Sequence, residues 1–115
     1  MLAAIVSSAV LNCGTHSAGP TALESPPAGA VCMANAFRRH CTPATYTLSI
    51  MGVDTIDRRA FRIASCRVLV DETFRVVPQP PHVTGRRTCT AIRRTPTDVI
   101  ATGCTGDRKS VSLTH

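Results

Sequence analysis

The stretch Cys41–Cys66 reads CTPATYTLSIMGVDTIDRRAFRIASC, and the rest of the chain is organised around it. Tyr46, Leu48 and Ile50 fall on one side of an extended chain, and the residues between them fall on the other. This period of two predicts a half-buried strand over residues 46–51. The stretch also carries the only tyrosine of the protein.

A second strand is predicted in the later part of this stretch, because Phe61 and Ile63 share one face. The apolar positions in residues 66–70 have the opposite phase. A change of phase in a period-two pattern indicates a β-bulge, which we expect near Ala64–Ser65. A competing interpretation is a helix over Asp57–Cys66, because several apolar residues there nearly form a helical stripe.

The segments on either side are short and interrupted by turn residues. Ala30–His40 is predicted to be a helix, since its apolar residues recur at helical spacing and cations occupy its last turn. Turns are predicted at Gly52 with the TIDRR segment and at Asp71–Glu72, and an exposed loop at Val77–Arg87. Further strands are expected at Cys89–Ile92, Val99–Thr102 and Val111–Leu113.

These elements predict a mainly β domain, a small disulfide-stapled antiparallel sandwich or barrel of about six short strands with one short helix. The alternative is an α+β sandwich. With 43% hydrophobic residues, mostly small, and 3% aromatic residues, the chain has material for one thin core. Covalent cross-links would then contribute much of its stability.

Six cysteines can supply those cross-links: Cys13, Cys32, Cys41, Cys66, Cys89 and Cys104. Their number is even, their spacing is wide and no C-x-x-C pair occurs, so disulfides in an oxidising, extracellular compartment are favoured over zinc ligation. Spacing does not choose among the fifteen connectivities that six cysteines allow. The ends of the predicted helix, Cys32 and Cys41, would lie about 13 Å apart, too far for a mutual bridge. We expect Cys41 to bond the leader or the helix, and Cys66 to bond Cys89 or Cys104.

The N-terminal segment has two interpretations. Residues 2–11, LAAIVSSAVL, have the length of a signal-peptide core, although no positive charge precedes them, and residues 1–18 then form the signal. Alternatively, residues 2–11 are a first strand, and Cys13 is paired. Residues 19–30 are rich in Gly, Pro, Ala and Ser and predict a flexible leader, with a single domain over residues 31–115. No stretch reaches transmembrane length.

The net charge is +6, and the basic residues are almost all arginine. Few aromatic residues are present and none lies among the arginines, which disfavours a nucleic-acid partner. An anionic surface or an acidic protein is the expected partner. The candidate contacts are the paired arginines Arg38, Arg39, Arg58, Arg59, Arg86, Arg87, Arg93 and Arg94.

No catalytic, cofactor-binding or metal-binding residues are predicted. The four histidines are scattered, and none forms a recognisable set with a nucleophile and an acid. His40 precedes Cys41, but an oxidised Cys41 could not act as a nucleophile. We therefore expect a protein that is not an enzyme.

In the layout of the whole chain the protein resembles the small secreted cysteine-rich proteins of fungi, the effector and killer-toxin class. The resemblance implies a secreted, non-enzymatic binding protein that acts on a host or competitor molecule. One alternative is a secreted proteinase inhibitor that presents Thr42–Ala44 or Val77–Arg87 as its loop. Another is a cationic antimicrobial or membrane-active protein.

Overall fold

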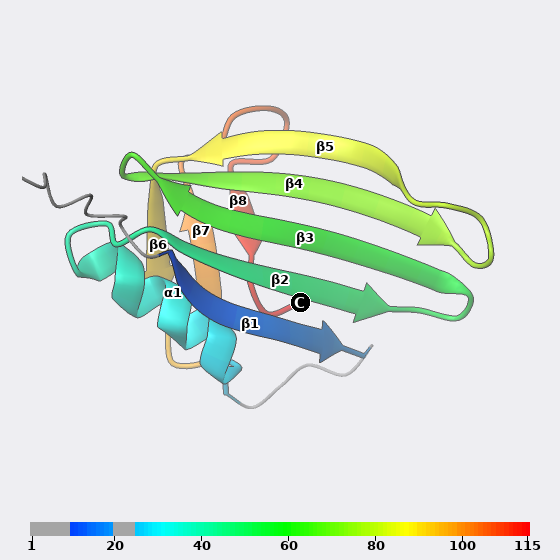
Figure 1. Cartoon of the computed structure of the whole chain (residues 1–115), viewed down its shortest axis with the longest axis horizontal. Coiled ribbons are helices and arrows are strands. Elements are labelled where there is room, and N and C mark those ends of the chain that lie inside the picture. Colours follow the sequence, from blue (N-terminus) through cyan, green and yellow to red (C-terminus); the bar gives the residue numbers. More distant parts are fainter. Residues whose placement is uncertain (1–9, 20–24) are drawn as a thin grey trace, which may run out of the picture.

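Five strands form one large twisted sheet in the computed structural model, which describes residues 10–19 and 25–115 (Figure 1). The strands lie side by side in chain order, with β1 parallel to β2 and the other neighbours antiparallel. Their bounds are β1 Leu11–Ala18, β2 Ala44–Met51, β3 Thr55–Ala64, β4 Arg67–Val76 and β5 His82–Cys89. The helix α1, Ala28–Arg38, connects β1 to β2, as a parallel pair requires.

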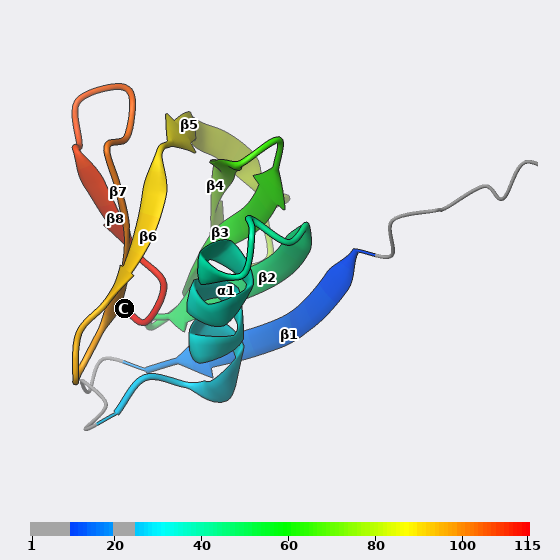
Figure 2. The same cartoon turned by 90° about the vertical axis from the view of Figure 1, so that its left-hand side faces the viewer.

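A smaller sheet covers part of the same face of the large sheet as α1 does (Figure 2). Its antiparallel strands are β6 Ala91–Arg94, β7 Val99–Thr102 and β8 Ser110–Ser112. The mainly β prediction with two sheets, one short helix and three disulfides is confirmed. The described residues form eight strands rather than about six, and the helix considered for Asp57–Cys66 is wrong because β3 occupies that segment.

The core lies between the inner face of the large sheet and the second layer. Tyr46 of β2 and Phe61 of β3 are opposite each other in the ladder, and their rings stack with centroids 6.1 Å apart. The Tyr46 hydroxyl donates a hydrogen bond to the Leu113 carbonyl at 3.2 Å, which joins the two layers. Gly29 lets α1 approach closely, because a Cβ there would meet Tyr46 Cε1 at 2.5 Å.

The turn between β3 and β4 explains the change of phase that we attributed to a bulge. Ser65 and Cys66 both have positive φ, 51° and 58°, and they form a two-residue hairpin turn between Ala64 and its ladder partner Arg67. The predicted bulge near Ala64–Ser65 is therefore wrong. An irregularity does occur between β4 and β5, where the register shifts between Glu72 and Thr73.

Three other local predictions are also wrong. Asp71–Glu72 is not a turn but the middle of β4, and the TIDRR segment belongs to β3, so that the chain turns at residues 52–54. The predicted loop at Val77–Arg87 is shorter, because β5 begins at His82. In each case sheet pairing over a long ladder outweighs the local preference of charged or turn-forming residues.

The disulfides are Cys13–Cys32, Cys41–Cys66 and Cys89–Cys104. The expectation that Cys41 and Cys66 bond other partners is wrong. The ladder pairs Ala44 with Ile63, so continuing the same register by three residues brings Cys41 opposite Cys66, with their Cα atoms 4.9 Å apart. Three disulfides indicate an oxidising environment.

The N-terminal strand β1 covers residues 11–18 and places Cys13 beside α1, to which it is bridged. Residues 1–9, which include most of the predicted signal-peptide core, lie outside the described residues, as do residues 20–24. The helix begins at Ala28, within the segment predicted to be a flexible leader. Within the described ranges, no helix has the length and apolar character needed to cross a membrane.

Candidate binding surface

Strand geometry separates two of the four arginine pairs that the sequence presents as units. Arg58 and Arg59 are consecutive in β3, and Arg86 and Arg87 are consecutive in β5, so each pair directs its side chains to opposite faces of the sheet. Arg58 and Arg86 lie on the outer face and are exposed. Arg59 and Arg87 point toward the second layer.

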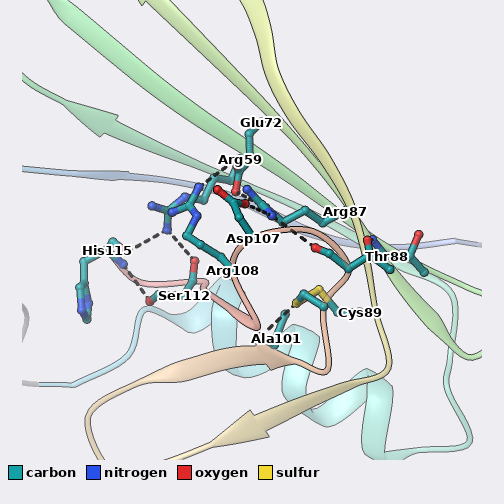
Figure 3. A network of polar contacts seen from close by, with 12 residues as sticks. Arg59, Glu72, Arg87, Thr88, Cys89, Ala101, Asp107, Arg108, Ser112 and His115 are labelled. Atoms are coloured by element: carbon teal, nitrogen blue, oxygen red, sulfur yellow. Dashed lines mark hydrogen bonds and ion pairs between the residues drawn. A yellow bond between two sulfur atoms is a disulfide. The ribbon is translucent and has the colours of Figure 1, made fainter.

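The inward arginines belong to a network around Glu72, a β4 residue that is only 4% exposed (Figure 3). Arg108 Nη2 donates to Glu72 Oε2 at 2.9 Å, and Arg87 Nε lies 3.5 Å from Glu72 Oε1. Arg87 also donates from Nη1 to Asp107 at 2.9 Å, which raises the pKa of Arg87 and lowers that of the Asp107 carboxyl. The buried carboxylate is thus compensated by two cations from distant parts of the chain.

Arg59 ties the C-terminal segment to the large sheet. Its Nη1 donates to the Ser112 and His115 carbonyls, each at 2.9 Å (Figure 3). Desolvation lowers the pKa of Arg59, and nearby Asp57 and Glu72 oppose this shift. Arg59 and the nearly buried Arg87, with a side chain 9% exposed, therefore serve contacts within the fold.

The outer face of the large sheet has no second layer over it in the described part of the chain. We call it the arginine face, because it carries five arginines on β3, β4 and β5: Arg58, Arg62, Arg67, Arg75 and Arg86. Asp71 is the one acidic residue among its described positions. Asp71 pairs with Arg86 at 3.5 Å, and both side chains are well exposed, so the pair contributes little to stability.

A shallow hollow of about 340 Å³ lies in the middle of the arginine face. Ala60 and Arg62 of β3 line it, and so does Asp71 of β4, the ladder partner of Ala60. Thr45 and Thr47 of β2 also line it. The hollow is lined by one arginine and one aspartate, so the positive charge of the arginine face comes from the arginines around the hollow.

The other two arginine pairs lie away from this face. Arg38 ends α1 and Arg39 follows it, and Arg93 and Arg94 are exposed on β6 of the smaller sheet. A separate, mostly apolar groove of about 540 Å³ runs between α1 and the start of β1. It is lined by Leu11, Ala28, Val31, Cys32, Ala36 and Arg39, among others.

Sequence reasoning missed Arg62, Arg67 and Arg75 because they have no arginine neighbour in the chain. The available signal was the alternation itself: Phe61 and Ile63 were predicted to share one face, so Arg62 between them had to lie on the opposite face. The alternation of side chains along a strand therefore identifies the exposed arginines better than the occurrence of two consecutive arginines in the sequence does.

The described residues contain no cluster of three or more histidine, cysteine or acidic side chains that could hold a metal ion. All six cysteines are in disulfides. Of the histidines, His82 makes an edge-to-face contact with Phe74, with ring centroids 6.0 Å apart, and His115 Nδ1 lies 2.8 Å from the Thr114 hydroxyl.

Comparison with known proteins gives no relative. No family model matches the chain, and neither a similar curated protein nor a similar solved structure was found.

Proposed function

We propose that the chain is a secreted, cysteine-rich, non-enzymatic binding protein, effector- or toxin-like, that acts on a host or competitor molecule. Its ligand is anionic, and the arginine face binds it. Three disulfides in one small domain support a role outside the cell, where such bridges persist.

The observation that carries the proposal is the asymmetry of the large sheet. One face is packed against α1 and the smaller sheet, whereas the other carries five arginines and one acid. Guanidinium groups bind carboxylate, sulfate or phosphate through paired hydrogen bonds, so an anion that spans several strands can contact more than one arginine.

The aromatic residues argue for an acidic polymer or protein over single-stranded nucleic acid. Tyr46 and Phe61 are buried on the inner face. Phe74 and its ladder partner His82 also lie on the inner face, since Phe74 is two residues after the inward-facing Glu72 in β4. The arginine face thus offers no aromatic ring for base stacking, which contributes much of the affinity of single-strand binders.

One of the two candidate loops of the proteinase-inhibitor alternative, Thr42–Ala44, does not have the exposure that an inhibitory loop needs. Ala44 is fully buried at the start of β2, and the Pro43 carbonyl accepts a hydrogen bond from Leu11 N at 2.9 Å. Thr42–Ala44 is therefore held against α1 and β1 by backbone hydrogen bonds where β2 begins, and does not project toward a protease. Residues 77–81 remain as an exposed loop.

Chromatography on immobilised heparin, a sulfated polysaccharide, tests the proposal. The variant Arg62→Gln/Arg67→Gln removes two cations from the arginine face, and Arg93→Gln/Arg94→Gln removes the same charge from the smaller sheet. The first variant should elute at clearly lower salt than the second, because only the first loses direct contacts. Equal shifts would mean that net charge alone governs retention and would refute a specific role for this face.

A further inference from the structure

Exposed apolar side chains gather at one end of the large sheet. Seven large hydrophobic residues are exposed among the described residues, and five of them lie there: Met51, Val53, Val76, Val77 and Val83. Val53 is 90% exposed and Val83 is 54% exposed. A concentration of this kind on a small protein marks a contact surface, whereas single exposed apolar residues are ordinary.

These residues lie in or beside two hairpin loops, which are next to each other at the right-hand end of the sheet in Figure 1. One is the turn between β2 and β3, and the other connects β4 to β5. Val77 N donates to the Asp54 carbonyl at 2.9 Å, so the backbone itself joins the loops. We call this end, with its five exposed apolar residues and the prolines of residues 78–81, the apolar tip.

The longer loop has the backbone chemistry that an apolar medium requires. Residues 77–81 read VPQPP, and the three prolines have no N–H to satisfy. The two remaining donors are used within the chain, Val77 N by Asp54 and Gln79 N by the Val76 carbonyl at 2.7 Å. Unpaired backbone donors are costly in hydrocarbon, and this loop presents none.

The charges around the tip balance. Arg58 and Arg75 lie beside it on the outer face, where they line a small hollow with Pro81. Asp54 is in the shorter turn, and Asp57 is on the inner face of β3. The apolar residues therefore supply the local attraction. Arg75 Nε donates to the Gln79 carbonyl at 2.8 Å, and the long side chain of Arg58 can extend to an anionic headgroup.

We propose that the apolar tip inserts shallowly into the interfacial region of an anionic lipid bilayer. The tip projects from the sheet, and its apolar side chains are aliphatic. Anchors at protein–protein interfaces are instead enriched in tryptophan, tyrosine and arginine held in fitted pockets. Shallow insertion at a lipid surface needs exposed apolar area, and the net charge of +6 attracts the whole molecule to anionic lipid.

Co-sedimentation with vesicles tests the proposal with a matched pair of substitutions. Val53→Thr changes the tip, and Val10→Thr makes the same change at an exposed valine elsewhere, 55% exposed. Val→Thr retains the shape and the β-branch but places a hydroxyl in the bilayer. On vesicles of phosphatidylcholine and phosphatidylserine, Val53→Thr should weaken binding about tenfold, and Val53→Thr/Val83→Thr about a hundredfold.

The controls separate this surface from the arginine face. Val10→Thr should bind vesicles as the parent protein does, and the tip variants should retain their heparin elution. Equal binding by Val53→Thr and Val10→Thr would overturn the proposal, and so would a parent protein that does not sediment with these vesicles. Loss of self-association in the tip variants, without a change in vesicle binding, would assign the tip to a protein contact and would also overturn it.

Discussion

Tyr46 makes the alkaline stability of this protein predictable. The side chain is 1% exposed, and burial raises the pKa of its phenol from 10.0 to about 12. Below pH 10 the phenol is neutral in both the native and the unfolded state. Between pH 10 and 12 the unfolded state ionises first and binds fewer protons than the native state, so the free energy of unfolding falls as pH rises.

The size of the fall follows from the shift in pKa. Two pKa units correspond to about 3 kcal/mol, lost progressively between pH 10 and about 12 and not beyond, where both states are ionised. For a domain of this size that is a large fraction of the net stability. Tyr46→Phe provides the comparison. It loses the hydrogen bond to Leu113, at about 1 kcal/mol near neutral pH, but it lacks the titrating group.

The measurement is unusually direct, because the chain has one tyrosine and no tryptophan. Tyrosinate absorbance followed against pH should give a midpoint near 12 for the folded protein and near 10 in denaturant. Denaturant unfolding at pH 9, 10, 11 and 12 should show the parent protein losing its advantage over Tyr46→Phe. A folded midpoint near 10, or parallel loss of stability in the two proteins, would refute the argument.

Three further predictions concern stability and are measured by denaturant unfolding. Replacing both cysteines of the Cys41–Cys66 bridge with serine should lower the free energy of unfolding by about 3.5 kcal/mol, the loop-closure value for a sequence separation of 25. A much smaller loss would show that the unfolded chain is already constrained there. Glu72→Gln should cost about 2 kcal/mol, because it removes the charged acceptor of Arg108 and leaves Arg87 with Asp107 as its remaining ion-pair partner. Asp71→Asn, one position along β4, should change stability by about 0.5 kcal/mol or less, and equal effects would contradict the burial argument. Arg59→Gln should lower the free energy of unfolding by about 2 kcal/mol, because it loses hydrogen bonds to two carbonyls. The neighbouring substitution Arg58→Gln should leave stability nearly unchanged. A larger loss for Arg58→Gln than for Arg59→Gln would mean that the two faces of the sheet are misassigned.

The strands were predictable where alternation is regular. The strand expected at residues 46–51 is β2, Ala44–Met51, and the strand expected at Val99–Thr102 is β7 with the same bounds. Alternation marks β2, whereas β7 is marked as a short apolar run between turn residues, and neither signal needs knowledge of the partner strands.

The β3–β4 turn could not be recognised because its residues carry no hairpin signal. Two-residue turns with positive φ at both positions usually contain asparagine, aspartate or glycine, and here serine and cysteine occupy them. The bridge from Cys66 to Cys41 holds this turn in place. Tertiary cross-linking can therefore replace the local preference that sequence reasoning looks for.

The burial of Glu72 also could not be predicted from the sequence. An acidic pair beside a threonine predicts a turn, yet Glu72 continues the inward series of Val68 and Val70 in β4. Its burial depends on Arg87 and Arg108, which are distant in sequence and reach it only after the sheet and the C-terminal loop have formed. A single sequence does not reveal such long-range compensation.

The N-terminal strand was obscured by its composition. Residues 11–18 have few large apolar side chains, and only Ala18 among them is buried. An edge strand beneath a closely packed helix needs small residues rather than large ones, and Gly29 on the helix follows the same requirement. The sequence therefore left residues 1–18 open between a signal peptide and an N-terminal strand, and residues 11–18 are a strand of the sheet.

The cross-links of this fold are concentrated at one end of the large sheet, and the exposed binding features extend toward the other. Cys13–Cys32 ties β1 to α1, Cys41–Cys66 ties the end of α1 to the β3–β4 turn, and Cys89–Cys104 ties β5 to the loop that leads into β8. The network around Glu72 adds the C-terminal segment. The apolar tip has only strand pairing and a few loop hydrogen bonds, so it contributes little burial to the core. Because stability resides in the cross-linked end, substitutions at the tip or on the arginine face can change binding without unfolding the domain, and the two surfaces can be tested separately.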